Sequence, residues 1–141
     1  MYDLASGKLK NAITGGHWNA TEILRMDLDK RAIYITGLGR EPGDPYFQYF
    51  YSINMDGSNL RLLSPDSANH SISLSPDGKY FVDTYSTPQI PPVYVLRNIK
   101  NNKSLELERA DISKLLATGW EAPLSFSTKA RDGKTDCYGM L

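Results

Sequence analysis

The sequence predicts a mainly β fold, a partial β-propeller of about two and a half four-stranded blades, with a short helix and a strand pair near its C-terminal end. Three segments that begin at Tyr2, Tyr51 and Tyr94 look alike, each reading as an alternating strand, a polar turn and a returning strand that starts at a leucine. Their tyrosines lie 49 and 43 residues apart, and a repeat of roughly 40 to 50 residues is typical of propeller blades. Frequent glycines and other turn residues favour short strands.

The first full blade is expected over 18–63, preceded by a partial hairpin over 2–14. A tight turn at Asp56-Gly57 suits the last connection of this blade, because glycine has no Cβ to clash at positive φ. The strands are expected at 21–28, 31–36 and 46–54, and from Leu60 onward.

The second full blade is expected over 70–109. Strands at 71–75 and 79–84 flank a turn in which Pro76 takes the second position and Gly78 lies beyond it, a pattern that favours a β-turn between adjacent strands. In the third look-alike segment a longer Asn/Lys loop replaces the tight turn, so that hairpin is predicted with a longer connection.

The pattern changes after the second blade. Residues 110–117 space their apolar side chains as a helix does, and we expect Asp111 to cap this helix and Gly119 to end it. Two strand-like runs follow, at 123–129 and 135–141. The chain stops in mid-pattern and so few blades cannot close a ring, so we expect a piece of a longer protein.

Composition indicates one globular domain and excludes several partners. The length of 141 residues, with 40% hydrophobic and 23% charged residues, suits a single domain. The 16 basic residues balance 16 acidic ones, which gives no general attraction to nucleic acid. No apolar run approaches the roughly 20 residues of a membrane helix. Since Cys137 is the only cysteine, internal disulfides and thiolate zinc cages are excluded.

The sequence assigns no catalytic, substrate-binding or metal-ligating residue, and no cofactor is expected. The Gly-x-Ser-x-Gly pentapeptide of a nucleophile elbow is absent. A loop role is favoured for His17, which follows Gly15-Gly16, and a structural role for His70, which precedes a predicted strand. The two histidines are 53 positions apart and share no ligand spacing. Cys137 is expected to be a small buried hydrophobic side chain.

Two further segments have both a functional and a structural interpretation. Gly37–Gly43 has the glycines of a phosphate-binding loop, but a strand follows it rather than a helix, so a blade loop is favoured. Tyr46–Tyr51 holds five aromatic residues in six, which could stack on sugars or bases, although packing between neighbouring sheets is favoured. Asn-x-Ser/Thr triplets at Asn19, Asn69 and Asn102 matter only in a host that glycosylates secreted proteins.

Several segments, taken in order, resemble one known family. Residues 16–23 and 33–36 are similar to its Gly-x-Trp-x-Val-Thr blade opening, and 71–80 carries its Ser-Pro-Asp-Gly turn. Residues 86–93 are similar to its Ser-x-Pro-x-x-Pro-Pro segment, and 120–139 resembles its passage into a second domain. The family comprises the dipeptidyl peptidase IV-type members of the prolyl oligopeptidase family of serine peptidases.

This resemblance implies an eight-bladed propeller packed on an α/β-hydrolase domain that releases Xaa-Pro and Xaa-Ala dipeptides from peptide N-termini through a serine acyl-enzyme. It implies that 1–109 forms the last propeller blades and that 110–141 leads into the hydrolase domain. The nucleophile, its Asp and His, and the paired glutamates that hold the substrate's amino terminus would lie outside this sequence, so the fragment alone is expected to be inactive. The longer protein of which this chain would be a piece, here called the parent, would be periplasmic or secreted, with a cytoplasmic location also open.

Two functions are therefore compatible with the sequence. In the first, the chain is a non-catalytic piece of such an exopeptidase, whose partners are peptide substrates, the rest of the propeller and the hydrolase domain. In the second, it belongs to a propeller that serves only as a binding scaffold. Because a cut propeller exposes strand edges and blade faces, the isolated chain is expected to self-associate. The candidates for blade packing are Trp18, Tyr34, Tyr51, Leu74, Tyr80 and Tyr94.

Overall fold

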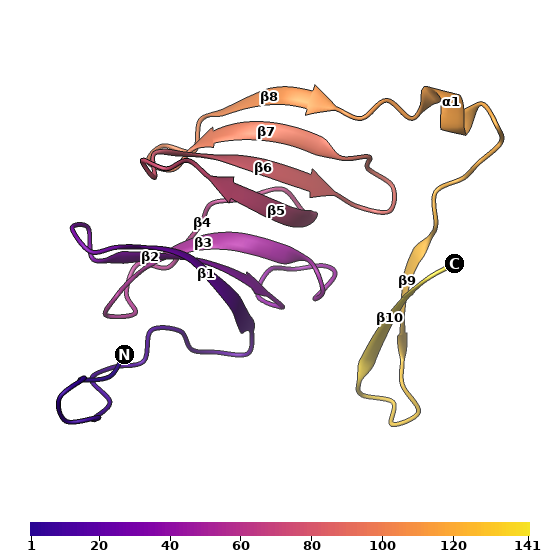
Figure 1. Ribbon diagram of the computed structural model, residues 1–141. Coiled ribbons are helices and arrows are strands. Elements are labelled where there is room, and N and C mark those ends of the chain that lie inside the picture. Colours follow the sequence, from indigo (N-terminus) through magenta and orange to yellow (C-terminus); the bar gives the residue numbers. More distant parts are fainter.

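The computed structural model describes residues 1–141, and two four-stranded antiparallel sheets form its body (Figure 1). Blade 1 consists of β1 (Asn19–Asp27), β2 (Ala32–Leu38), β3 (Gln48–Asn54) and β4 (Arg61–Leu62). Blade 2 consists of β5 (Asn69–Leu74), β6 (Tyr80–Ser86), β7 (Val93–Asn98) and β8 (Ser104–Arg109). In both, each strand pairs with the next in chain order. This meander is the blade of a β-propeller, as the repeats predicted.

The turns between strands adopt the backbone conformations that the sequence indicated. Gly57 and Gly78 have φ angles of 87° and 65°, values that favour glycine because a Cβ would clash. The longer connection from β7 to β8 places Asn102 at a φ of 54°. The third look-alike segment therefore forms a hairpin, as expected. The hairpin predicted over 2–14 is represented by one isolated bridge between Tyr2 and Leu9.

The segment after blade 2 runs through a single helical turn to a separate strand pair. The helix α1 (Ser113–Leu116) is shorter than the predicted 110–117, because none of its residues is buried and short helices need packing to persist. Asp111 does not cap it; the carboxylate instead accepts a hydrogen bond from the Ser113 amide at 2.9 Å. The strands β9 (Ser125–Lys129) and β10 (Asp136–Met140) pair as a hairpin that lies beside the blades (Figure 1).

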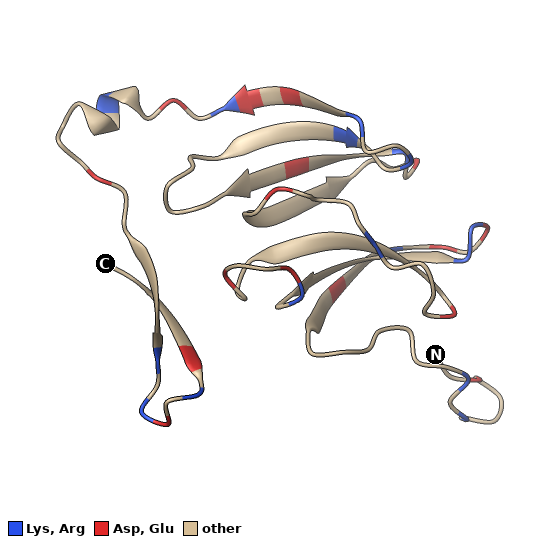
Figure 2. Cartoon of the chain, turned by 180° about the vertical axis from the view of Figure 1, so that it is seen from behind, with Lys and Arg blue, Asp and Glu red and all other residues tan.

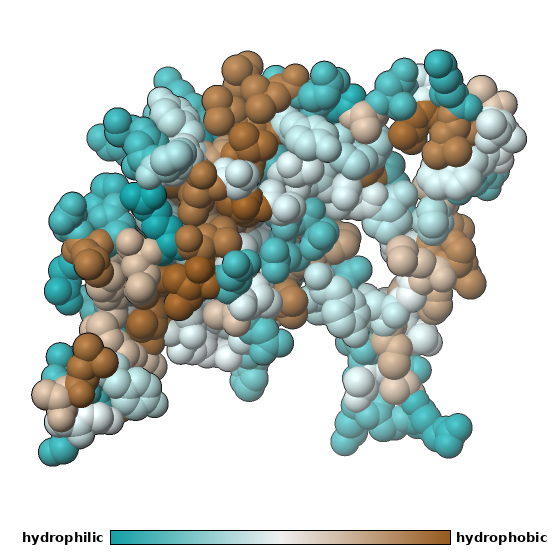
Figure 3. Space-filling view, viewed as in Figure 1, coloured by the Kyte–Doolittle hydropathy of each residue, from teal (hydrophilic) through white to brown (hydrophobic).

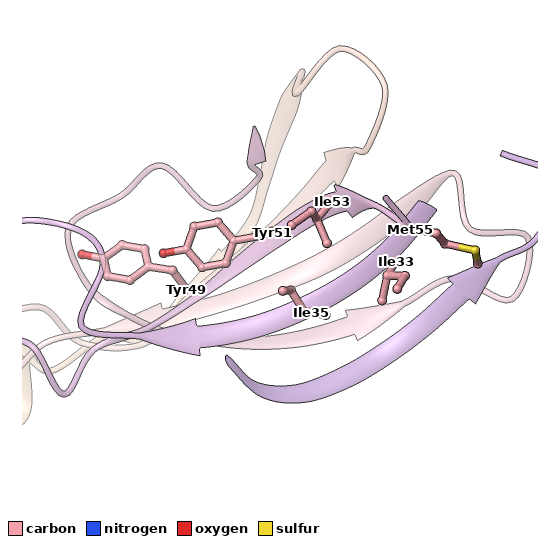
Figure 4. Packing of buried hydrophobic residues seen from close by; sticks show 6 residues of the cluster. All are labelled: Ile33, Ile35, Tyr49, Tyr51, Ile53 and Met55. Atoms are coloured by element: carbon pink, nitrogen blue, oxygen red, sulfur yellow. The ribbon is translucent and has the colours of Figure 1, made fainter. Parts of the chain in front are cut away.

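One hydrophobic cluster covers the face of blade 1 opposite to Tyr34 and Phe50, and its Tyr49 also reaches His70 of blade 2. Because side chains alternate along a strand, every second residue of β2 and β3 contributes to it (Figure 4). Ile13 and Trp18 from the segment before β1 pack against this cluster, with the Trp18 and Tyr51 rings 5.3 Å apart. The amino-terminal segment therefore closes this face. The buried members are Ile33, Ile35, Tyr49, Tyr51, Ile53 and Met55.

A second cluster joins the two blades. Tyr34 and Phe50 of blade 1 contact residues of blade 2 in this cluster. Those residues are Phe81 of β6 and Ile99, which follows β7, and Leu63 from the connection between β4 and β5 is buried with them. The rings of Phe50 and Phe81 are 4.9 Å apart at an interplanar angle of 69°, the edge-to-face contact that aromatic pairs prefer. The two sheets thus stack through a shared core. Tyr34, Tyr51, Trp18 and Leu74 pack in these clusters, as predicted.

The other two predicted packing residues are exposed. Tyr80 and Tyr94 retain 43% and 40% of their accessible surface. Their neighbours Phe81 and Val95 point toward blade 1, so the alternation of the strand turns Tyr80 and Tyr94 to the opposite face. This face has no neighbour in the chain. Figure 3 shows hydrophobic residues exposed over the sheets on the side of the molecule that it displays.

Gly37 of β2 is required by a close approach of Trp18 to the sheet. A Cβ at this position would lie 2.4 Å from Trp18 Cζ3 and 2.8 Å from the Asn19 carbonyl oxygen. We expect Gly37→Ala to lower the free energy of unfolding by about 1–3 kcal/mol, as overpacking does, measured by urea denaturation. Gly15→Ala is the matched control, because no atom lies within 4 Å of its Cβ position. Equal stability of the two variants would contradict the prediction.

Candidate functional site

The structure disperses the residues that the sequence singled out. His17 is exposed in the loop before β1, as expected. Cys137 is exposed in β10, so the prediction of a buried side chain is wrong: both faces of a two-stranded hairpin that lies apart from the sheets stay open to water. Gly37–Gly43 ends β2 and begins the loop to β3, the favoured interpretation. In the aromatic run, Tyr49, Phe50 and Tyr51 are buried in β3, whereas Tyr46 precedes the strand and is 69% exposed.

His70 lies at the centre of a buried polar cluster that sequence reasoning missed. The residue is the second of β5 and has 1% of its surface exposed. Its Nδ1 is 2.7 Å from Asp83 Oδ1, and its Nε2 is 2.8 Å from the Asp66 carbonyl oxygen. The other oxygen of Asp83 accepts a hydrogen bond from Arg97 Nε at 2.9 Å, and Arg97 also pairs with the Asp66 carboxylate. Blade 2 and the connection from blade 1 are thereby tied together. We call these four residues the His70 cluster.

The polar groups of the His70 cluster form hydrogen bonds with one another. A carboxylate and a carbonyl oxygen can only accept hydrogen bonds. Both nitrogens of His70 face such acceptors, one on the Asp83 side chain and one on the Asp66 backbone. The buried guanidinium of Arg97 faces the carboxylates of Asp66 and Asp83, and such pairing is the condition under which buried charges are tolerated.

The His70 cluster has no catalytic geometry. In a nucleophilic triad, the histidine holds a carboxylate at one nitrogen and a hydroxyl or thiol at the other. Here the second nitrogen of His70 is taken by the Asp66 carbonyl oxygen, and the ring is closed in by Tyr49 and Tyr85, whose ring centroids lie 5.4 and 5.6 Å away. The structural role favoured for His70 is therefore the one its contacts support.

A signal for this cluster was present in the strand alternation. Asp83 and Arg97 occupy buried positions between apolar residues, Asp83 two residues after Phe81 and Arg97 two residues after Val95. A charged residue at a core-facing position needs an opposite charge nearby. Two such positions on strands predicted to be adjacent would have indicated an ion pair between them.

A groove lies between blade 1 and the β9–β10 hairpin. Its volume is about 580 Å³. Trp18 and Tyr46 form the blade wall and Tyr138 the hairpin wall, with the rings of Tyr46 and Tyr138 6.2 Å apart and perpendicular. Arg40 lies 5.7 Å above the Trp18 ring, a cation–π contact. The groove offers aromatic surfaces but no nucleophile paired with a base.

The hydroxyl of Tyr51 beneath this region is held in its neutral form. It donates a hydrogen bond to Glu41 Oε1 at 3.2 Å. Burial is the main cause that raises the pKa of Tyr51, and the negative charge of Glu41 raises it further. The ring acts as a packed hydrogen-bond donor and not as an acid or base near neutral pH.

The turn of the β9–β10 hairpin is organised by Asp132. Its carboxylate accepts hydrogen bonds from the amides of Lys134 and Thr135, both at 2.9 Å, and from the Thr135 hydroxyl at 2.6 Å. These hydrogen bonds lower the pKa of Asp132 from 3.8 to about 2, and the bond from the Thr135 hydroxyl is the largest cause, followed by those from the two amides. The ionised carboxylate therefore favours this turn.

Acid is expected to loosen this turn. Because the folded pKa of Asp132 lies below its unfolded value, the stabilisation is present above about pH 4 and is lost as the pH falls towards 2. We expect the amide NMR signals of Lys134 and Thr135 to titrate near pH 2, and Asp132→Asn to remove that titration. A midpoint near pH 4 would show that the hydrogen bonds do not favour the ionised form.

No helix in the structure has both the length and the apolar character needed to cross a bilayer.

Curated relatives of the chain are dipeptidyl peptidases. The chain is 30% identical to dipeptidyl peptidase 4 of Arthroderma otae over 105 residues, which cover 73% of this chain and 13% of that protein. It is 29% identical to dipeptidyl peptidase 4 of Trichophyton equinum over 93 residues, which cover 64% of this chain and 12% of the relative. The chain thus spans a small part of the length of these enzymes.

Solved structures agree with this. A protein of Bacteroides ovatus, solved as a candidate dipeptidyl aminopeptidase IV, superposes with a TM-score of 0.68 at 26% identity, over 89% of this chain and 17% of that one. Dipeptidyl peptidase 4 of Porphyromonas gingivalis superposes with a TM-score of 0.75 at 21% identity, over 99% of this chain and 19% of that one, which supports the fold. The family described as the dipeptidyl peptidase IV N-terminal region matches residues 1–92, which hold blade 1 and the first two strands of blade 2. The chain belongs to the dipeptidyl peptidase IV N-terminal region family.

Proposed function

We propose that the chain is a non-catalytic part of a serine-type dipeptidyl peptidase that releases Xaa-Pro or Xaa-Ala dipeptides from peptide N-termini. The observation that carries this proposal is the family match over 1–92 together with two stacked four-stranded blades. The absence of a histidine available to a nucleophile supports a structural role, since His70 is enclosed and His17 lies in an exposed loop. The task of the two blades is to build the wall of the propeller.

The same proposal divides the chain at the end of blade 2. Residues 1–109 would be propeller and 110–141 the passage into an α/β-hydrolase domain. In support, the blades share a hydrophobic core, whereas the β9–β10 hairpin pairs only with itself and meets the blade 1 side at the ring contact of Tyr46 and Tyr138. Just before the hairpin, the Pro123 carbonyl oxygen accepts a hydrogen bond from Gln89 Nε2 of the connection between β6 and β7.

Further partners follow from the same assignment. The exposed far face of blade 2, which includes Tyr80 and Tyr94, would pack on the next part of the propeller. In the isolated chain we propose that such faces pair with a second copy instead. Light scattering over a wide concentration range tests this: a mass that rises with concentration is expected, and a monodisperse monomer throughout would refute self-association. For the parent we propose a periplasmic or secreted location.

The activity is tested on the protein in which this chain is embedded. We expect that protein to release the chromophore from an Xaa-Pro amide, and a serine-directed phosphonate to abolish the release. The chain of residues 1–141 alone is expected to show no release at equal molar concentration. Turnover by the purified chain would overturn its non-catalytic role. An inactive parent without a serine nucleophile would favour the binding scaffold.

A further inference from the structure

We propose that the junction of the two blades holds a binding site for a small amphiphilic anion, a molecule with a compact apolar body and one carboxylate, sulfonate or phosphate group. The junction contains a cavity of about 540 Å³, within the size range of pockets that take small molecules. Four basic side chains and two buried apolar ones line it, and no acidic residue does. These six are Lys30, Arg61, Lys79, Lys100, Tyr34 and Ile99.

The four basic residues come from separate turns and strands that the stacking of the blades brings together. Lys30 lies in the turn between β1 and β2, and Arg61 begins β4. Lys79 precedes β6, and Lys100 lies in the turn between β7 and β8. Figure 2 shows basic positions, with some acidic ones, gathered on the turns at this end of the two sheets. A ligand here would contact both blades at once.

Arg61 is held in place with donor groups to spare. Its Nη2 donates to the Ile99 carbonyl oxygen at 2.6 Å, and its Nη1 to the Lys100 carbonyl oxygen at 3.2 Å. These bonds fix the guanidinium across the blade junction and leave its other N–H groups without a protein acceptor. A guanidinium in a fixed position is suited to binding the oxygens of a carboxylate or phosphate.

The positive charge at the cavity is only partly compensated. Lys30 pairs with Asp27 at 2.7 Å, and Lys79 with Asp77 at 3.5 Å. Arg61 and Lys100 form no ion pair, and the ammonium group of Lys100 makes no hydrogen bond. Arg61 and Lys100 are thus available to bind an anion. The positive charges of Lys30 and Lys79 nearby would add to the attraction.

The floor of the cavity favours an apolar body on the anion. Tyr34 and Ile99 are 4% and 5% exposed and contribute to the hydrophobic cluster between the blades. The aliphatic stems of the lysines extend this apolar lining toward the charged rim. An inorganic ion would use the rim alone, whereas an amphiphilic anion uses both.

The site is separate from the groove beside the hairpin. Lys30 lies just before β2, and Leu38, which lines that groove, ends it. Seven residues of strand span about 20 Å. The cavity therefore opens at the opposite end of blade 1 and does not depend on the proposed peptidase function.

The test is an NMR titration of the chain at low ionic strength with sodium octanoate, with 1-octanol and inorganic phosphate as comparison probes. We expect octanoate to shift the amide signals of Gly78 and Ile99 saturably, and to bind at least tenfold more tightly than either comparison probe. Lys100→Gln is expected to weaken octanoate binding roughly three- to tenfold, since it removes a charge whose side chain supports no fold contact. Lys114→Gln, on the exposed helix α1, is the matched control and should leave the affinity unchanged.

Arg61→Gln provides a second variant, with an expected loss of about tenfold. Octanol that binds as tightly as octanoate would show that apolar surface alone is responsible and would overturn the proposal. Phosphate that binds as tightly would equally refute a role for the apolar floor. An unchanged affinity in Lys100→Gln and Arg61→Gln would exclude this cavity as the site.

Discussion

Asp83→Ala is expected to lower the free energy of unfolding by about 3–5 kcal/mol, because it removes the buried carboxylate that bonds both His70 and Arg97 and leaves the buried guanidinium of Arg97 with one counter-ion fewer. Asp83 is fully buried and bonds both His70 Nδ1 and Arg97 Nε. Since proteins are stable by only about 5–15 kcal/mol, such a loss would remove a large share of the total. Urea denaturation followed by far-UV circular dichroism measures it.

The control for this variant removes a carboxylate from an exposed pair of the same blade. Glu106 pairs with Arg109 at 2.9 Å while both side chains stay about half exposed, so Glu106→Ala is expected to change stability by no more than about 0.5 kcal/mol. His70→Ala should resemble Asp83→Ala, because it too breaks the His70 cluster. If Asp83→Ala costs no more than Glu106→Ala, the cluster does not stabilise the fold.

Phe81→Ala is expected to cost about 3–5 kcal/mol, the usual range for truncating a large aromatic side chain in a core. Phe81 is 1% exposed and packs edge-to-face on Phe50 of the other blade. The resulting cavity lies between two sheets, so its effect should reach both. We expect hydrogen exchange to accelerate in β2 and β3 as well as in β6.

Leu105→Ala is the matched control for the core variant. Leu105 lies in β8 of the same blade and is 62% exposed, so its truncation is expected to change stability by about 0.5 kcal/mol or less. Faster exchange confined to blade 2 in Phe81→Ala would contradict a core shared by the blades.

The blades could be predicted from sequence because each is built from contacts between neighbours along the chain. Alternation located β2 and β6 to within about two residues, and glycine marked the turns at Gly57 and Gly78. These signals are local: they depend on side-chain period and backbone conformation, not on what packs against the strand.

What lies against each face could not be predicted in the same way. Alternation separates Tyr80 from Phe81 but does not say which of the two meets another sheet, and the first was assigned to packing although it is exposed. Asp66 and Arg97 are 31 positions apart, and their pairing depends on how the connection folds over blade 2. The cavity lined by Lys30 and Lys100 arises only from stacking, since neither residue belongs to a motif.

The short connection between the blades has a consequence for ring geometry. Ser64 accepts a hydrogen bond from the Phe50 amide at 2.8 Å, and two residues later Asp66 is held by His70 and Arg97. A ring of blades closes only when the rotations from each blade to the next add up to a full circle, so an error in one rotation leaves the ring open or strained. Because this connection is bonded to blade 1 at its start and to blade 2 at its end, its hydrogen bonds define the rotation between the two blades. The angle between blade 1 and blade 2 is then a property of these two blades, set before any further blade constrains it.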